Sequence, residues 1–363
     1  MTEAQELEKL RQSIDSIDRQ IQELINQRAR CAQQVAEVKE KYAQPGEQVL
    51  FYRPEREAQV LRNVMARNEG PITGEGMARL FREIMSQCLA LEEPLQVAFL
   101  GPEGTFTQQA AVKHFGHAVN CQSKVSIADV FRDVESGSAN FGVVPVENST
   151  EGVVTHTLDS FFDSNLSICG EVTLRIHHNL MSQGDGSNIK RIYSHSQSLG
   201  QCRQWLDQHY PNAERIALNS NAEAALKASQ DPESAAIAGE VASELYKLNL
   251  LHANIEDRPD NTTRFLIVGP NPTLSSGEDK TSIMVSSRNQ PGALYQVLEP
   301  FHSAGISLTR IETRPARSGT WNYAFFIDFE GHRDDASIKT VLEQLQGVAA
   351  DYKWLGSYPK AVL

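Results

Sequence analysis

Two cations on one face of a predicted helix are the first side chains whose types and spacing suit a chemical task. From Glu3 to Tyr42 the chain has neither Gly nor Pro, and apolar residues recur at alternating steps of three and four. Arg28 lies on this apolar stripe, and Lys39 follows three helical turns later on nearly the same face. Arg28 alone is equally well explained as an arginine at the stripe's edge with its head group in water. Two buried cations need an anion between them, which favours a site for an acidic small molecule.

Polar turns beside short apolar segments form the second group of candidates. They are Val146-Glu147-Asn148-Ser149-Thr150-Glu151-Gly152, Ser194-His195-Ser196-Gln197-Ser198-Leu199 and Asn261-Thr262-Thr263-Arg264-Phe265. Open α/β sheets keep their sites at strand ends, where these turns are predicted to lie. Each turn alone is better explained as an ordinary Asx or Ser/Thr turn, so only their combination favours a site.

The composition limits the classes of protein. With 363 residues, 40% hydrophobic and 22% charged, the chain suits a globular protein of two or three domains. Its net charge of -12 argues against nucleic-acid binding, and no apolar stretch approaches the ~18 residues of a membrane span. The five cysteines lack a CxxC pair, and the acidic N-terminus does not suit a signal peptide. We therefore expect a cytoplasmic protein without a metal site.

An all-helical region must position the first group of candidates. Its long first helix, with an apolar stripe from Leu7 to Leu24, would extend about 60 Å and needs a partner such as a second copy of the chain. A second helix is expected from Pro54, and a third is expected after the capping residue Thr73.

Two further regions follow. Between residues 97 and 268 short apolar strands alternate with helices, one of them expected over 199–210, and His177-His178 falls in a strand-like run. Beyond a linker at 270–277 the predicted order is strand, helix, strand, strand, helix, strand, which is ferredoxin-like.

The helical region resembles the all-helical chorismate mutase family over residues 1–93. The motifs that carry the resemblance are Leu10-Arg11-x-x-Ile14-Asp15, Arg28, Val35-Ala36-x-x-Lys39 and Arg56-Glu57. The resemblance implies an intertwined homodimer with Arg11 contributed by the opposite chain. The substrate-contacting residues that it implies are Arg11, Arg28, Lys39, Arg56, Glu57, Cys88 and Glu92.

In that family the site needs cations and no cofactor. The resemblance implies that the arginines hold the carboxylates of chorismate and that Glu57 binds its ring hydroxyl. It assigns Lys39 and Glu92 as catalytic residues at the breaking ether oxygen. Glu92 can donate a hydrogen bond only when protonated, so we expect mutase turnover to fall with rising pH. Arg53 and Cys88 depart from the usual residues of the family.

The central region resembles prephenate dehydratase over residues 96–270, with two α/β lobes like a periplasmic binding protein and the active site between them. The motifs, in the family's order, are Gly101-Pro102-Glu103-Gly104-Thr105-Phe106, Val146-Glu147-Asn148-Ser149, Ser194-His195-x-Gln197 and Thr263-Arg264-Phe265. The resemblance implies that Thr263 is the catalytic residue beside the leaving hydroxyl, most simply as a general acid. The substrate-positioning residues that it implies are Glu147, Asn148, Ser149, His195, Gln197, Arg264 and Phe265.

The C-terminal region, residues 280–363, resembles the ACT domains of dehydratases in Asn289-Gln290-Pro291-Gly292-Ala293-Leu294 and Ile311-Glu312-Thr313-Arg314-Pro315. The implied site for L-phenylalanine comprises Asn289, Pro291, Gly292, Ala293, Leu294, Glu312, Thr313, Arg314 and Pro315. A small domain that only packs against its neighbour is the plainer alternative, because a fold alone proves no function.

Together these resemblances predict a fused enzyme. It would convert chorismate to prephenate and prephenate to phenylpyruvate, without a cofactor, under feedback inhibition by L-phenylalanine, as a homo-oligomer of at least two chains. Two alternatives stay open. One is the same fold acting on arogenate, and the other is a ligand-responsive binding protein whose enzyme sites have decayed.

Overall fold

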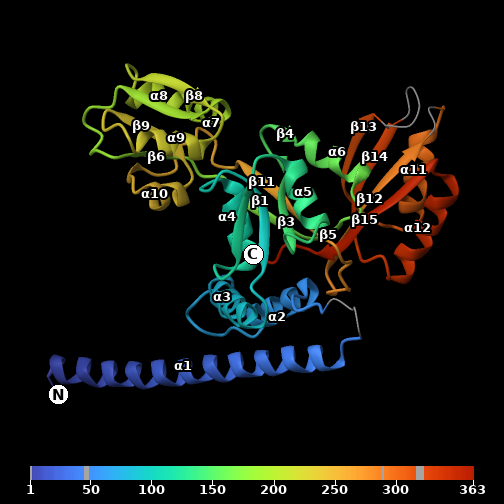
Figure 1. The fold of residues 1–363 in the computed structure, drawn as a ribbon, viewed down its shortest axis with the longest axis horizontal. Coiled ribbons are helices and arrows are strands. Elements are labelled where there is room, and N and C mark those ends of the chain that lie inside the picture. The colour runs from blue at the N-terminus through green and yellow to red at the C-terminus, as the bar shows by residue number, and fades with distance from the viewer. Residues whose placement is uncertain (1, 45–48, 288–289, 316–322) are drawn as a thin grey trace.

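The computed structural model describes residues 2–44, 49–287, 290–315 and 323–363, which form three parts in chain order (Figure 1). The first part is all-helical, as predicted, with helices α1 (Glu3–Tyr42), α2 (Pro54–Ala66) and α3 (Gly74–Glu92). Thr73 caps α3, because its hydroxyl accepts a hydrogen bond from the Gly76 N–H at 3.1 Å. No helix in the described ranges is long and apolar enough to cross a membrane.

The first half of α1 extends away from the rest of the chain (Figure 1). Its predicted apolar stripe is largely exposed, with Leu10 61% and Leu24 62% accessible, and the only buried residue of the helix is Ala36. An apolar stripe of this length is unfavourable in water, so within one chain α1 lacks the partner that its sequence requires.

The second part consists of two α/β lobes (Figure 1). The elements of the first lobe are β1 (Gln96–Leu100), α4 (Phe106–Phe115), β2 (Asn120–Lys124), α5 (Ile127–Glu135), β3 (Phe141–Asn148), β4 (Gly152–Val153), α6 (Thr155–Asp163), β5 (Ser167–Arg175) and β11 (Thr262–Gly269). The elements of the second lobe are β6 (Asn179–Ser182), β7 (Arg191–His195), α7 (Ser196–Gln201), α8 (Arg203–His209), β8 (Glu214–Leu218), α9 (Asn221–Ala228), β9 (Ser234–Ala238), α10 (Glu240–Tyr246) and β10 (Asn249–His252). The chain crosses between the lobes twice, from β5 to β6 and from β10 back to β11.

Each lobe has its own mixed sheet. The strand order is β2-β1-β3-β11-β5 in the first lobe and β10-β6-β9-β7-β8 in the second. The returning strand β11 runs antiparallel between β3 and β5, and its register places Thr263 opposite Asn148 and Arg264 opposite Glu147. The two-lobed architecture expected from the sequence is therefore confirmed.

Two details of the second part differ from the expectation. The single helix expected over 199–210 is divided at Cys202 into α7 and α8. The cause is a distant carboxylate, because Asp257 accepts hydrogen bonds from the N–H groups of Gln204 and Trp205 and so starts a new helix there. His177-His178 lies in the connection between β5 and β6 and not within a strand.

The third part is a ferredoxin-like domain, as predicted. Its elements are β12 (Asp279–Ser287), α11 (Ala293–Ser303), β13 (Leu308–Pro315), β14 (Tyr323–Glu330), α12 (Ala336–Val348) and β15 (Asp351–Pro359). The strand order β13-β14-β12-β15 leaves β13 at one edge of the sheet.

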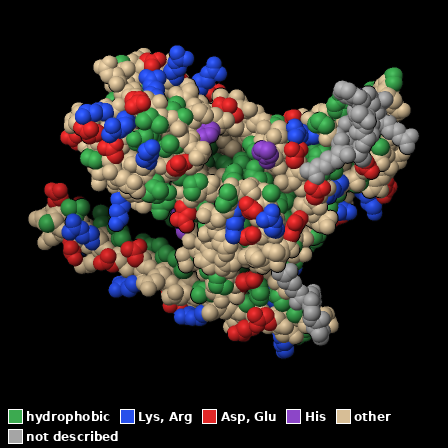
Figure 2. Space-filling model, turned by 45° about the horizontal axis from the view of Figure 1, so that its top comes forward, with side chains coloured by type: hydrophobic (Ala, Val, Ile, Leu, Met, Phe, Trp, Pro, Cys, Tyr) green, Lys and Arg blue, Asp and Glu red, His purple; other side chains and the backbone are tan. Residues whose placement is uncertain are grey.

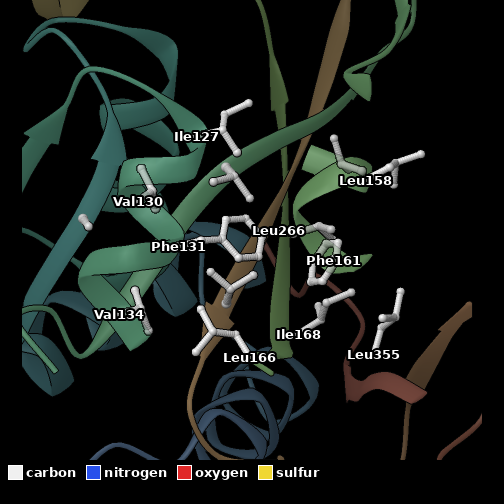
Figure 3. Packing of buried hydrophobic residues seen from close by; sticks show 14 of the residues in the cluster. Ile127, Val130, Phe131, Val134, Leu158, Phe161, Leu166, Ile168, Leu266 and Leu355 are labelled. Carbon is white, nitrogen blue, oxygen red and sulfur yellow. The ribbon is translucent and has the colours of Figure 1, made fainter. Parts of the chain in front are cut away.

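The third part shares a core with the first lobe (Figure 3). Phe131 of α5, Phe161 of α6 and Ile168 of β5 belong to one buried cluster with Leu355 of β15. At Gly356 a Cβ atom would overlap the carbonyl oxygen of Ile168, so β15 approaches β5 as closely as a glycine allows. The C-terminal domain is thus packed firmly on the lobe that carries β11.

Candidate functional sites

Arg28, Lys39 and Glu92 come together where α1 packs against α3. Burial raises the pKa of Glu92, and the positive charges of Lys39 and Arg28 partly offset that rise. Burial lowers the pKa of Lys39, while Glu92 opposes the change. The Lys39 ammonium also donates hydrogen bonds to the carbonyl oxygens of Leu50 and Phe51 at 3.0 and 3.1 Å, which fixes its position. Two cations and one carboxyl group with a raised pKa therefore lie close enough for their charges to act on one another.

The other mutase candidates are placed differently. Arg11 and Arg56 are exposed, and Cys88 is buried one turn before Glu92 on α3. Arg11 precedes Arg28 by 17 positions, which is roughly 26 Å along a helix at ~1.5 Å per residue. Within one chain these two arginines cannot contact one small ligand.

Glu57 is turned toward the first lobe of the second part. Its carboxylate lies 3.2 Å from the Arg82 guanidinium, in a small cavity that Tyr52, His114 and the C-terminal residues also line. Burial raises the pKa of Glu57, and Arg82 offsets part of that rise. The structure therefore does not bring Glu57 together with Lys39 and Glu92.

Two charged residues that the sequence did not assign to the site lie near Lys39 instead. Glu55 is buried, and its carboxylate is 3.5 Å from the Arg53 guanidinium. Arg53 helps to lower the pKa of Lys39 and Glu55 opposes this, so both act on the cluster. The signal available was their position at the start of α2, where Arg53 is the N-cap and Glu55 lies in the first turn, directly after the segment that holds Lys39.

A cleft of about 310 Å³ lies between the two lobes of the second part (Figure 2). Five of the predicted dehydratase residues line it, namely Asn148, His195, Gln197, Thr263 and Phe265. Strands β3 and β11 of the first lobe supply Asn148 and Thr263, while His195 and Gln197 come from the β7–α7 turn of the second. The cleft therefore has walls from both lobes, as the resemblance implied.

The hydrogen bonds of Asn148 determine whether the Thr263 hydroxyl donates or accepts a hydrogen bond. The Asn148 Oδ1 accepts from the backbone N–H groups of Thr150 and Glu151 at 2.9 and 3.0 Å, so its amide nitrogen must face the other way. That nitrogen donates to the Thr263 Oγ1 at 2.8 Å and to the Asn261 Oδ1 at 2.9 Å. Because Asn148 can only donate here, Thr263 accepts, and its own hydrogen is left for another acceptor.

The chain of hydrogen bonds continues through residues to which the sequence assigned no role in the site. Asn261 donates to the Gln201 Oε1 at 2.9 Å, and the same oxygen bonds to the His178 Nε2 at 2.7 Å. Burial lowers the pKa of His178, so its imidazole is neutral and its Nε2 donates this bond. Asn261 could have been found from its position two residues before Thr263, whereas nothing in the sequence linked Gln201 or His178 to the site.

Glu151 is another residue to which the sequence assigned no role. It lines the cleft, and its carboxylate accepts a hydrogen bond from Gln197 across the lobes at 3.3 Å. Its signal was its place in the same polar turn as Asn148.

Arg264 and Glu147 lie on the opposite face of the sheet from the cleft. Successive side chains of a strand point to opposite faces, so Thr263 and Phe265 line the cleft while Arg264 is directed at the C-terminal domain. Arg264 forms ion pairs with Glu171 at 2.8 Å and with Asp328 at 2.6 Å.

Glu147 lies 3.1 Å from the Arg310 guanidinium of β13, and so it too is directed at the C-terminal domain. The third residue that does not reach the cleft, Ser149, instead fixes the loop, since its hydroxyl accepts from the Thr262 N–H at 2.9 Å. The structure therefore brings Glu147, Ser149 and Arg264 to positions around the cleft wall and not to the cleft itself.

The predicted phenylalanine residues lie on α11 and β13. Gly292 adopts a positive φ of 80° at the start of α11, directly before Ala293 and Leu294, and Pro291 precedes it. Asn289 lies outside the described residues.

On β13 the predicted residues alternate in exposure. Glu312 and Arg314 are half-buried, whereas Thr313 and Pro315 are exposed. Arg314 donates to both carboxylate oxygens of Asp159 on α6, at 2.8 to 3.0 Å. Arg314 is thus a link between β13 and the first lobe in this structure.

Among the described residues no group of His, Cys, Asp and Glu side chains could hold a metal ion.

The comparisons with family models divide the chain into the same three parts that the sequence patterns indicated. A model described as "Chorismate mutase type II" matches residues 10–93, one described as "Prephenate dehydratase" matches residues 97–273, and one described as "ACT domain" matches residues 281–347.

Similar proteins of known name extend over the whole chain. A protein of Pseudomonas aeruginosa named "Bifunctional chorismate mutase/prephenate dehydratase" is 60% identical and covers 100% of both chains. A protein of Neisseria gonorrhoeae with the same name is 52% identical over 97% of each chain. Among solved structures, a prephenate dehydratase of Arthrobacter aurescens in complex with L-Phe is 35% identical with a TM-score of 0.68, covering 73% of this chain and 90% of that one.

Proposed function

Because the chain belongs to the family of bifunctional chorismate mutase/prephenate dehydratases, we propose that its helical part converts chorismate to prephenate and its two-lobed part converts prephenate to phenylpyruvate. The alternative substrate arogenate is not favoured, since the relatives are named for prephenate. A decayed binding protein is not favoured either, because Arg28, Lys39 and Thr263 are all present.

The observation that carries the dehydratase assignment is the hydrogen bond from Asn148 to Thr263. It leaves the Thr263 hydroxyl hydrogen free to be donated to the ring hydroxyl of prephenate. As the ring carboxylate leaves as carbon dioxide, its bonding electron pair enters the ring and the C4–O bond breaks. The departing hydroxide takes a proton and leaves as water, and the ring becomes aromatic. Thr263 is then the general acid, and Asn148 holds it in position.

The test compares two substitutions of Thr263. Thr263→Val keeps the shape but removes the hydroxyl, and we expect kcat for prephenate to fall by about a hundredfold or more. Thr263→Ser keeps the hydroxyl and should retain most of the activity. If the valine variant keeps the wild-type kcat, Thr263 is not the general acid.

For the mutase reaction we propose that Arg28, Arg56 and Arg11 hold the two carboxylates of chorismate, and that Lys39 and Glu92 bind the ether oxygen. The raised pKa of Glu92 supports the last role, because a protonated carboxyl group can donate a hydrogen bond to an ether. Cys88 would border the substrate one turn away. For the ring hydroxyl, buried Glu55 is a better candidate than Glu57, because Glu57 is paired with Arg82 at 3.2 Å.

We also propose that the mutase site forms only in a homodimer. The exposed stripe of α1 supports a second copy as its partner, since two such helices would bury each other's leucines and isoleucines. The separation of Arg11 from Arg28 along α1 supports it too, because only a second chain can supply Arg11 to the site. An interleaved dimer of this kind matches the intertwined arrangement implied by the sequence.

L-phenylalanine is the proposed feedback inhibitor, with the C-terminal domain as its binding site. Support comes from the 35% identical prephenate dehydratase whose structure contains L-Phe, and from the match of residues 281–347 to the ACT domain model. Links from β13 to the first lobe through Arg310 and Arg314 would carry the response toward β3 and β11. The five free cysteines favour the reducing cytoplasm as the protein's setting.

A further inference from the structure

The dehydratase cleft has no cation for a doubly charged substrate. Prephenate carries two carboxylates, yet none of the residues that line the 310 Å³ cleft is a Lys or Arg. Arg264, the cation in the Thr-Arg-Phe motif, is engaged on the other face of β11 by Glu171 and Asp328. The one charged side chain in the cleft wall, apart from histidines, is the acid Glu151. Any cation that binds the substrate would therefore have to come from the surroundings of the cleft.

A second cavity of about 520 Å³ adjoins the cleft and contains such a cation. The two cavities share Glu151, Gln197, Gln201 and Asn261 in their walls. Arg258 is the only Lys or Arg that lines this second cavity.

Arg258 is exposed, and in the described part of the chain its guanidinium has no ion pair and no hydrogen bond. Its nearest acidic neighbour in sequence, Asp257, is already bound by the N–H groups that start α8. Arg258 also lies five residues before Thr263, on the segment that leads into β11. Arg258 is thus a cation without a partner among the described residues, on the segment next to strand β11, which carries Thr263.

The chemistry decides which carboxylate this cation would bind. The ring carboxylate loses its charge as carbon dioxide departs, so a cation bound to it would stabilise the substrate more than the transition state. The pyruvyl carboxylate keeps its charge from substrate to product, and a cation there stabilises both states alike. Both carboxylates are carried by the ring carbon opposite the leaving hydroxyl, but the pyruvyl carboxylate lies beyond a methylene and a carbonyl group, so it extends further from Thr263 when that hydroxyl is bound.

We propose that Arg258 binds the pyruvyl carboxylate of prephenate at the mouth of the interlobe cleft, and that it determines the affinity for substrate and not the rate of the chemical step. The proposal rests on the placement of the ring hydroxyl at Thr263. The free N–H groups at the starts of α4 and α9, which also line the cleft, are the competing ligands for that carboxylate.

The experiment measures dehydratase kinetics with prephenate for Arg258→Gln and Arg258→Lys in the full chain. Arg203→Gln is the control, because Arg203 is an exposed arginine of α8 that lines neither cavity. Mutase activity, which uses another part of the chain, reports that each variant is folded. Because a charge-assisted hydrogen bond is lost, we expect Arg258→Gln to raise KM about tenfold to a hundredfold with kcat within about threefold of wild type.

Arg258→Lys should fall between wild type and Arg258→Gln, and added salt should raise KM for the wild type more than for Arg258→Gln. Three results would overturn the proposal. They are a KM for Arg258→Gln within about twofold of wild type, a loss of kcat without a rise in KM, and an equal rise in KM for Arg203→Gln. The roles of Thr263 and Arg258 are tested separately, because substitution of Thr263 is expected to lower kcat, whereas substitution of Arg258 is expected to raise KM.

Discussion

Replacing Arg264 separates the two roles that the residue has been given, substrate positioning and attachment of the C-terminal domain. In the structure its guanidinium also donates to the Tyr358 hydroxyl at 2.9 Å, besides its bonds to Glu171 and Asp328. Arg264→Gln would leave Glu171 with a second cation, because Lys280 lies 2.7 Å from it. Asp328 would keep only hydrogen bonds and would become an uncompensated buried charge.

The expected magnitude follows from that burial. Breaking a buried ion pair by removing one partner costs about 3 to 5 kcal/mol. At roughly 2 to 4 °C per kcal/mol for a unit of this size, the calorimetric transition of the dehydratase and C-terminal parts should fall by about 6 to 20 °C. Arg264→Gln combined with Asp328→Asn removes both charges and should recover much of the loss. Arg132→Gln, at an exposed pair with Asp129, is the control and should change the transition little.

Dehydratase kinetics of the same variants complete the test. Well below the transition, Arg264→Gln should keep its KM for prephenate within about twofold of wild type, since Arg264 lies outside the cleft. Its inhibition by L-phenylalanine should weaken, because the link to β14 is lost. A large rise in KM with an unchanged thermal transition would refute this reasoning and return Arg264 to the substrate site.

Three further changes test other parts of the account. The Glu92 pKa lies above its ordinary 4.5, so mutase kcat should fall as the pH rises through that pKa, and Glu92→Gln should flatten the profile; an unchanged profile would contradict the role of Glu92. Glu57→Gln should lower the thermal transition and leave the KM for chorismate unchanged, since Glu57 pairs with Arg82; a raised KM would place it in the mutase site. Gly356→Ala should destabilise the C-terminal domain by more than 1 kcal/mol, measured by calorimetry, because its Cβ meets Ile168; equal stability would show that the strands can separate freely.

The architecture followed from the sequence because its patterns are local. The apolar stripe of α1, the alternation of strands and helices, and the ferredoxin-like order of the last elements each need only neighbouring residues to be recognised. The division of the helix expected over 199–210 could not be predicted, because its cause is the carboxylate of Asp257, about fifty residues away in the chain.

The dehydratase site could be predicted in part, because some of its residues are neighbours in the sequence. Thr263, Arg264 and Phe265 were grouped as adjacent residues of one motif, whereas the pleat of β11 sends the middle one to the opposite face. Gln201 and His178 join the site through long-range hydrogen bonds that no local pattern announces. Sequence neighbours therefore indicate a site, and the strand's two faces decide which of them reach it.

The central claim is that the protein carries out two reactions at two separate active sites, and it is tested most directly by following both reactions at once. Chorismate consumption and phenylpyruvate formation would be measured for the wild type, Lys39→Ala and Thr263→Ala. Thr263→Ala should still consume chorismate and accumulate prephenate without forming phenylpyruvate. Lys39→Ala should fail to consume chorismate yet convert added prephenate at the wild-type rate. Loss of both reactions in either folded variant, or of neither, would contradict the account.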